Sequence, residues 1–438
     1  MNLDYDLVKR LREQAGERLQ ERRRAEEAAG RPLTQDDMRV IARDVIADLL
    51  QAHALGRLNA GLAIPGIEEE DGYAAAVHAA LFGVGRLQPL LDDEDVENVN
   101  INGCDNVFVG YADGRQAKAE PIAASDDDLI KLIQTLAATS GLNSRPWDEA
   151  NPELDLQLPG GYRLSAVMGV SHRPALSIRR ARLDKVLLAD LRENGTITPE
   201  LENFLSAAVL ARRNIVIAGA TNAGKTTLLK ALANVIPPEE RLVTVERALE
   251  LGLHELTDLH PNVVALEERL PNLEGQGRVS MADLVRRSLR MDPSRVIVGE
   301  VLGDEIVSML NAMSQGNDGS LSTIHANSSR DVFHRISTYA IQAQERLPIE
   351  ASQMLIAGAI EFVVFIKRTR DPFSGLMRRR VVSVREVNGI DGRVLSSEIF
   401  AMTPDGTVKS AAPLSDERLE LLTDHGYRPD NGWGEQWS

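Results

Sequence analysis

The chain has 438 residues, of which 43% are hydrophobic and 26% are charged. These fractions are ordinary for globular proteins and exclude a disordered or fibrous chain, and the length allows two or three domains. The formal net charge of -16 argues against a nucleic-acid partner, because phosphate backbones attract basic surfaces, although a local basic patch is still compatible with it.

Compartment signals in the sequence indicate a cytoplasmic protein. The single cysteine, Cys104, has no second thiol with which to form an intramolecular disulfide. The most apolar run, residues 356–366, carries Glu361 and is shorter than the roughly 20 residues that cross a bilayer. Charged side chains near the first residues interrupt any signal peptide. We therefore expect any membrane association to be peripheral, from the cytoplasmic side.

The N-terminal segment, residues 1–65, is predicted to be helical. Acidic and basic side chains interleave over residues 1–30, which indicates an exposed helix. Thr34 and Asp37 have the spacing of a capping box and start a second helix. The acidic, glycine-containing stretch 61–72 is predicted to be a linker.

A smaller α+β domain is predicted over residues 73–190, because short strands and helices follow one another there. The expected elements are strands at 99–101, 107–109, 164–170 and 175–178 and a helix at 128–140 that ends at Gly141. Beyond this domain, Thr198 and Pro199 have the pattern of a helix start, and the helix is expected to run to about residue 211.

An α/β domain is predicted over residues 196–402, where apolar strands alternate with helices as in a parallel sheet covered on both faces. The expected strands span residues 214–218, 242–245, 263–266, 295–298 and 321–324. Apolar runs at 363–366, 381–387 and 394–399 predict a small antiparallel addition, with turns available at 388–389 and 391–392. Residues 403–438 are expected to be a tail whose end is loosely ordered.

A phosphate-binding loop lies between the strand at 214–218 and the next helix. The pattern G-x-x-x-x-G-K-[ST] is matched by Gly219, Ala220, Thr221, Asn222, Ala223, Gly224, Lys225 and Thr226. Thr227, the next residue, is also expected to bind the nucleotide. In such a loop backbone N–H groups turn toward an anion, the lysine reaches the β/γ-phosphates, and the hydroxyl contacts Mg²⁺. The sequence therefore predicts that the chain binds ATP with Mg²⁺.

Acidic residues are expected at the carboxyl ends of neighbouring strands, because the loop supplies one metal-facing oxygen and cannot activate water. Glu300 follows the apolar strand 295–298, and Glu246 follows the strand 242–245. We expect both carboxylates to act in catalysis and in binding Mg²⁺. His325 ends the strand 321–324 and is predicted to sense the γ-phosphate.

In this order, the four segments resemble the Walker A, Asp box, Walker B and His box of the type II/type IV secretion and pilus-assembly ATPases. The sequence is most similar to the CpaF branch, the motors of Tad (Flp-type) pili. Supporting stretches are residues 87–92, 99–103, 266–272, 283–290 and 298–303, and the resemblance covers about residues 80–400.

The resemblance implies a RecA-like C-terminal domain, a hexameric ring, and ATP held between the N- and C-terminal domains. It also implies a cytoplasmic motor that acts on an inner-membrane platform protein. Arginines that complete the site are expected at Arg163 and Arg179, with Arg180 a weaker candidate and Arg269 and Arg290 as secondary ones.

Two positions depart from the family pattern. Arg247 stands where an Asp usually follows the Asp-box Glu, and Leu302 stands where an Arg usually follows Gly-Glu-Val. They motivate one alternative, a nucleotide-binding assembly subunit that hydrolyses little. The other alternative is a nucleic-acid translocase with the same core, against which the net charge counts.

Overall fold

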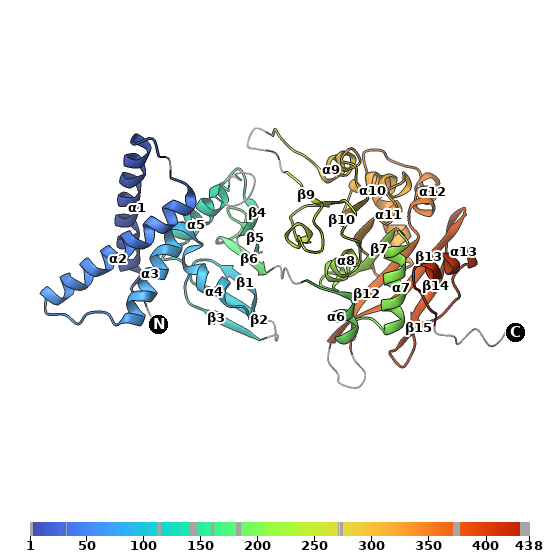
Figure 1. Cartoon of the computed structure of the whole chain (residues 1–438), viewed down its shortest axis with the longest axis horizontal. Helices are drawn as coiled ribbons and strands as arrows, with labels where there is room; N and C mark the ends of the chain where they lie inside the picture. The colour runs from blue at the N-terminus through green and yellow to red at the C-terminus, as the bar shows by residue number, and fades with distance from the viewer. Residues whose placement is uncertain are drawn as a thin grey trace. The chain divides into compact units, whose positions relative to one another are not determined.

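The computed structural model describes residues 3–31, 33–111, 115–139, 147–158, 162–180, 185–269, 271, 275–370 and 377–429. The chain divides into two compact units, Met1–Ala181 and Arg182–Ser438, whose elements are labelled in Figure 1. The second unit thus begins ahead of the boundary expected near residues 190–196. Over the described residues, no helix has both the length and the hydropathy needed to cross a bilayer.

The first unit begins with three helices: α1 (Tyr5–Ala28), α2 (Gln35–Asn59) and α3 (Ile67–Phe82). They share a core that contains Leu7, Leu11 and Ile46, so the expectation of a wholly exposed first helix is wrong for one face of α1. The predicted capping box is confirmed, because Thr34 and Asp37 exchange side-chain and backbone hydrogen bonds. The predicted linker is too long, because α3 already begins at Ile67.

A six-stranded antiparallel sheet completes the first unit, in the order β3-β2-β1-β6-β5-β4. Its elements are η1 (Gly85–Leu87), α4 (Gln88–Asp92), β1 (Val96–Asn102), β2 (Val107–Tyr111), β3 (Gln116–Ala119), α5 (Asp126–Thr139), β4 (Glu153–Leu158), β5 (Tyr162–Val167) and β6 (Ala175–Arg180). Alternate strand residues pack with α5 in one core. The strand expected at 164–170 ends at Val167, and the helix end expected at Gly141 lies outside the described residues.

A charged clamp fixes the turn before β2 to the start of α5. Arg173 donates to Asp126 through Nε (2.7 Å) and Nη2 (2.8 Å), and the backbone N–H of Cys104 donates to the same carboxylate (2.8 Å). A Cβ on Gly103 would lie 2.1 Å from Cζ of Arg173, so only glycine leaves room for the guanidinium. These hydrogen bonds hold the pKa of Asp126 well below its usual range.

The second unit is built on a nine-stranded sheet, in the order β15-β14-β13-β12-β7-β11-β10-β8-β9. Its strands are β7 (Ile215–Gly219), β8 (Leu242–Glu246), β9 (Val263–Glu267), β10 (Arg295–Val301), β11 (Leu321–His325), β12 (Phe362–Arg370), β13 (Met377–Asp391), β14 (Arg393–Met402) and β15 (Val408–Ser410). The six strands from β7 to β12 pair in parallel with one another, which confirms the predicted parallel sheet. On its other side β12 pairs antiparallel with β13.

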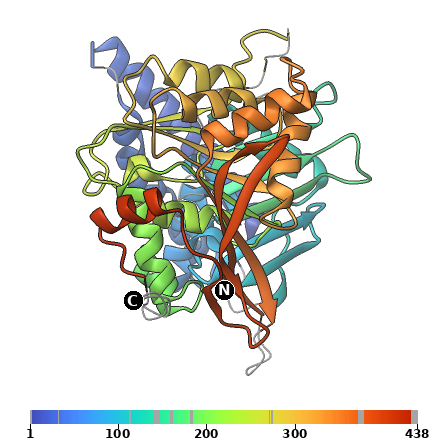
Figure 2. The ribbon, with the colours of Figure 1, turned by 90° about the vertical axis from the view of Figure 1, so that its right-hand side faces the viewer.

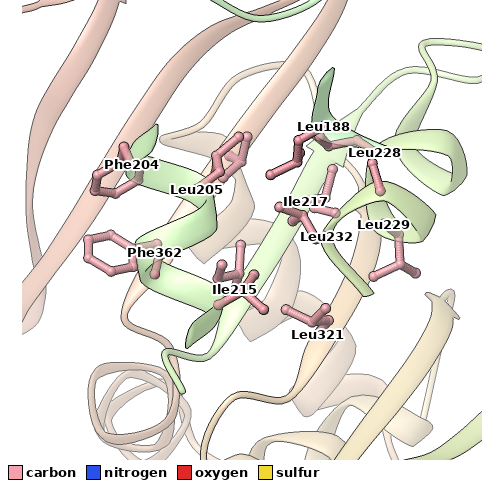
Figure 3. Packing of buried hydrophobic residues seen from close by; sticks show 14 of the residues in the cluster. Leu188, Phe204, Leu205, Ile215, Ile217, Leu228, Leu229, Leu232, Leu321 and Phe362 are labelled. Atoms are coloured by element: carbon pink, nitrogen blue, oxygen red, sulfur yellow. The ribbon is translucent and has the colours of Figure 1, made fainter. Parts of the chain in front are cut away.

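Helices cover both faces of this sheet, as predicted. They are α6 (Leu188–Glu193), α7 (Pro199–Leu210), α8 (Lys225–Ala233), η2 (Leu253–Glu255), α9 (Met281–Ser288), α10 (Glu305–Ser314), α11 (Asp331–Gln342), α12 (Ile349–Ala359) and α13 (Asp416–Asp424). One core joins α6, α7 and α8 to Ile215 and Ile217 of β7, and Figure 3 shows these side chains interdigitating. The other core joins α9 to α12 to Val216 and Ala218, so β7 is apolar on both sides.

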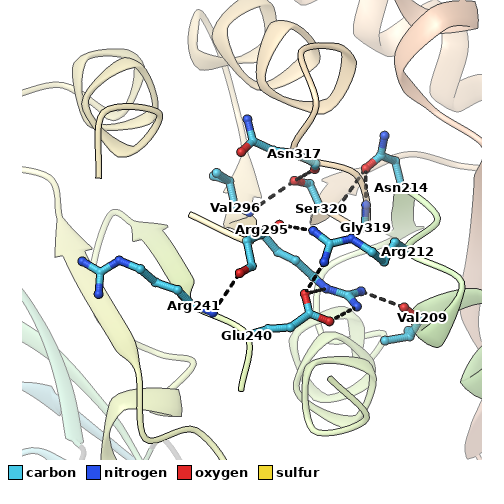
Figure 4. Close-up of polar contacts among 11 residues, drawn as sticks. Val209, Arg212, Asn214, Glu240, Arg241, Arg295, Val296, Asn317, Gly319 and Ser320 are labelled. Atoms are coloured by element: carbon cyan, nitrogen blue, oxygen red, sulfur yellow. Dashed lines mark hydrogen bonds and ion pairs between the residues drawn. The ribbon is translucent and has the colours of Figure 1, made fainter. Parts of the chain in front are cut away.

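A buried polar network lies at the amino ends of the central strands (Figure 4). Arg295, fully buried, donates to both oxygens of Glu240 (2.6 and 2.8 Å) and to the carbonyl of Val209 (2.7 Å). Arg212 donates to Glu240 and to the carbonyl of Ser294. The buried charges are therefore paired, which keeps this edge of the sheet rigid behind the strands that carry the site.

The C-terminal part is more ordered than expected. Strand β12 pairs in parallel with β7, so the addition is antiparallel only from β13 onward. The long strands β13 and β14 are orange to red in Figure 2, and β14 is joined to α12 by a hydrogen bond from Val394 N to Gln353 Oε1. Residues 388–389 form a bulge within β13 rather than a turn. The expectation of a loose end is wrong for α13, because Leu422 and Tyr427 are buried in the core.

Candidate functional site

The loop that follows β7 has the backbone expected of a phosphate-binding turn. Asn222 and Gly224 have positive φ (60° and 101°), and α8 begins at Lys225. Gly219 is required for a different reason, since a Cβ there would lie 2.4 Å from the carbonyl oxygen of Ile366 on β12. The first glycine thus allows close packing and the second allows the left-handed turn.

Lys225 lies where this loop meets the ends of β10 and β11. Its side chain is 7% exposed, and its Nζ lies 3.4 Å from the carbonyl oxygen of Ala220 and 3.3 Å from Oε1 of Glu300. His325 is also within reach, with Nδ1 3.3 Å and Nε2 3.4 Å from the same Nζ. Burial lowers the pKa of Lys225, and the charge of Glu300 opposes that shift.

Glu300 and His325 are brought together by two adjacent parallel strands. Nε2 of His325 lies 3.0 Å from Oε1 of Glu300, and both side chains are about one-third exposed. The strand ends are fastened by Thr323, whose hydroxyl donates to the carbonyl of Gly299 (2.8 Å). The structure therefore places two of the predicted site residues, Glu300 and His325, around the ammonium group of a third, Lys225.

Glu246 forms its hydrogen bonds with groups other than Lys225, Glu300 and His325. Its carboxylate is 3% exposed and accepts hydrogen bonds from the backbone N–H groups of Glu250 (2.8 Å) and Leu251 (2.9 Å) and from the Thr244 hydroxyl (3.2 Å). Burial raises the pKa of Glu246 to about 7. Its Cγ would lie 3.1 Å from a Cβ on Gly299, so it packs against the residue before Glu300.

Thr226 and Thr227 occupy the first turn of α8. Thr226 is half-buried and Thr227 is exposed. Over the described ranges, no group of three or more His, Cys, Asp or Glu side chains could hold a metal ion by itself. This donor set fits Mg²⁺ that is held largely by phosphate oxygens and water, with one hydroxyl and one carboxylate from the protein.

Arg163 and Arg179 belong to the first unit and are directly opposite each other on β5 and β6. Both side chains are exposed on the same face of the sheet. The weaker candidate, Arg180, is a structural residue here, because it donates to the carbonyls of Asp93 and Leu91 (both 3.0 Å). Arg163 and Arg179 are thus exposed, whereas Arg180 is half-buried against these two carbonyl groups.

The secondary arginine candidates lie on the surface of the second unit. Arg269 donates through Nε to the carbonyl of Gly277 (2.6 Å), and Arg290 is exposed after α9. Neither has a described contact with Lys225, Glu300 or His325.

The two departures from the family pattern meet at one buried carboxylate that sequence reasoning missed. Glu305 is fully buried, and its Oε1 accepts from Leu302 N (2.7 Å), Gly303 N (3.2 Å) and Arg247 Nη2 (3.4 Å). Nη1 of Arg247 lies 3.9 Å from Glu268. The only signal in the sequence was an acidic residue shortly after the predicted strand 295–298, which does not reveal burial.

Comparisons with known proteins agree on the region that carries this site. Residues 84–407 match the family described as "Type II/IV secretion system protein". A putative conjugal transfer protein of Mycobacterium tuberculosis is 35% identical over 329 residues, which cover 73% of this chain and 89% of that protein. The type IV secretion system protein VirB11 of Brucella suis is 30% identical over 320 residues, covering 65% and 84%.

Among solved structures, the ATPase DotB of Legionella pneumophila matches with a TM-score of 0.52 at 20% identity, covering 68% of this chain and 79% of that chain. At that identity the likeness concerns the fold alone. It agrees with the α/β, RecA-like architecture of the second unit.

Proposed function

The chain belongs to the type II/IV secretion system protein family, and from that premise we propose that it is a hexameric ATP-hydrolysing motor for Tad-type pilus assembly or related secretion. The observation that carries the proposal is the convergence of Glu300 and His325 on Nζ of Lys225. The family supports the ATPase chemistry in general, while the CpaF-like motifs in the sequence favour the pilus branch.

Lys225 and Glu300 divide the chemistry of hydrolysis between them. The ammonium group binds the β/γ-phosphates, and the carboxylate orients and polarises the attacking water. Nζ of Lys225 lies 3.3 Å from Oε1 of Glu300, so a phosphate that binds the ammonium group weakens this ion pair. Nucleotide binding thereby frees the carboxylate of Glu300 to contact the attacking water. His325, which lies beside Lys225 and Glu300, senses whether the γ-phosphate is present.

Mg²⁺ would be held by the hydroxyl of Thr226 and the carboxylate of Glu300, and it would neutralise charge on the phosphates. We assign Glu246 a positioning role rather than a ligand role. Its Oε2 is already bonded to two backbone N–H groups, and its side chain supports Gly299 at the end of β10.

Arg163 and Arg179 are proposed to complete the site when the two units close on the nucleotide within the ring. An arginine supplied in this way neutralises charge that develops on the transferred phosphoryl group and can be worth on the order of 10³-fold in rate. In the first unit the pair is exposed and in register, which presents two positive charges together. Its platform partner at the inner membrane would then be moved by the closure.

Phosphate release by the purified full-length chain tests this function, with Mg²⁺ present and with Mg²⁺ chelated. Release that depends on Mg²⁺ and on Lys225 supports an ATPase. Release no greater than that of Lys225→Ala would overturn it. Recovery of one inner-membrane protein with Glu300→Gln chain loaded with ATP, and not with ADP, would support the motor role.

A further inference from the structure

A basic hairpin runs past the phosphate-binding loop, although the chain as a whole is acidic. Strand β12 pairs with β7 up to Phe365 and Ala218, and then continues beyond the end of β7. The extended part of β12 and the facing part of β13 carry Lys367, Arg368, Arg370, Arg378, Arg379 and Arg380. None of these residues has a role in the function proposed above.

The strand register sorts these charges onto two faces. Arg368 pairs directly with Arg379, two residues beyond the buried pair Ile366 and Val381. Since side chains alternate along a strand, all four share one face. Ile366 and Val381 pack in the same core as Leu228 of α8, so this face is turned toward the helix that begins at the loop.

Arg379 is in contact with the loop itself. Its Nε donates to the carbonyl oxygen of Asn222 (3.2 Å), and its Cδ lies 3.1 Å from where a Cβ on Gly224 would be. Among the residues that the structure describes, neither Arg368 nor Arg379 forms an ion pair with an acidic side chain. Two like charges directly opposite on adjacent strands are unfavourable, and a bound anion would offset that cost.

From these contacts we infer that Arg368 and Arg379 bind the α-phosphate and ribose end of the nucleotide. The order of the strands indicates which end of the nucleotide the arginines contact. Strands β10 and β11, which carry Glu300 and His325, lie on one side of β7, and β12 lies on the other side. Lys225, Glu300 and His325 mark the γ-phosphate side, so the arginine pair flanks the opposite side of the loop. Guanidinium groups bind phosphate through two parallel N–H donors.

This inference rests on the proposed function and makes the arginine pair a binding element, distinct from the catalytic acid. Calorimetric titration of the full-length protein with ADP, and steady-state kinetics with ATP, would test it in Arg368→Gln and Arg379→Gln. Each variant should raise the Kd for ADP and the KM for ATP about tenfold or more, because a charge-assisted phosphate contact is lost, while kcat changes little.

The matched control is Lys367→Gln, which removes one exposed charge from the opposite face of the same hairpin and should leave Kd and KM unchanged. Arg368→Gln separates nucleotide contact from support of the loop, because only Arg379 bonds to Asn222. Unchanged Kd in Arg368→Gln, or an equal rise in Lys367→Gln, would overturn the inference while the wild-type chain still binds ADP. Failure of the wild-type chain to bind ADP would overturn the proposed function as well.

Discussion

Oε1 of Glu300 lies 3.3 Å from Nζ of Lys225, so the proposed catalytic base and the phosphate-binding cation form an ion pair across the ends of β10 and the loop. Nε2 of His325 lies 3.0 Å from the same oxygen. This ion pair couples phosphate binding by Lys225 to activation of water by Glu300, because a change in what Lys225 binds alters the environment of Glu300. Substitutions of the two residues should therefore have different signatures.

Lys225→Ala should abolish hydrolysis and weaken nucleotide binding, since it removes the buried cation at the β/γ-phosphates. Binding of ATP and ADP by calorimetry and release of phosphate would be measured side by side. Glu239→Ala, an exposed change in the loop after α8 and outside the site, serves as the folding control. Normal turnover by Lys225→Ala would refute the phosphate site.

Glu300→Gln should still bind ATP but hydrolyse it at least about 10²-fold more slowly, because the amide keeps the shape and loses the base. The measurement is single-turnover hydrolysis with ATP prebound. Loss of binding together with loss of turnover would show that Glu300 is mainly structural.

Arg163→Ala and Arg179→Ala should each lower turnover strongly, by as much as about 10³-fold, while leaving ADP binding to the loop intact. Lys118→Ala, an exposed lysine on β3 of the same sheet, is the control. Arg180→Ala should instead lower the thermal stability, because two carbonyls lose their donor. Wild-type turnover in both arginine variants would exclude a site shared between the units.

Arg247→Asp should destabilise the second unit, because it places a third carboxylate beside Glu268 and the fully buried Glu305. Adding Leu302→Arg should recover part of the loss, since the backbone of residue 302 already contacts Glu305. Chemical denaturation of the two single variants and the double variant gives the coupling energy. Additive effects would show that the two departures are independent.

Asp126→Asn should destabilise the first unit at neutral pH by breaking the Arg173 clamp. The pKa of Asp126 is lowered in the folded chain, so its contribution is present above the unfolded value and is lost as the pH falls. The wild-type and variant melting temperatures should therefore converge in acid. A difference that is constant between pH 7 and pH 3 would contradict this assignment.

Much of the site could be predicted because its motifs have local causes. The loop at 219–226 is defined by glycine conformations and by a strand and helix on either side, and parallel strands place Glu300 and His325 at one edge. What could not be predicted depends on tertiary contacts. The carboxylate of Glu246 accepts hydrogen bonds from the backbone N–H groups of residues 250 and 251 instead of joining the Lys225 cluster. Arg379 is brought to the loop by the register of β12 and β13, which the sequence pattern does not reveal.

The incorrect prediction of an exposed first helix has a similar origin. Leu7, Leu11, Ala15 and Leu19 recur every four residues and are buried, but the interleaved charges between them dominated the sequence pattern. A helix with a narrow apolar stripe is recognised only when its partners are known. Here the partners are α2 and α3, which follow in the chain.

The core shared by α1, α2 and α3 ends at Phe82, and the family match starts at residue 84. Gly83 therefore lies between a helical layer with its own hydrophobic interior and the part of the chain that matches the family. The layer meets the part of the chain that follows through a cation–π contact, in which the guanidinium of Arg86 lies 3.6 Å from the centroid of the Tyr5 ring, rather than through a shared hydrophobic interior.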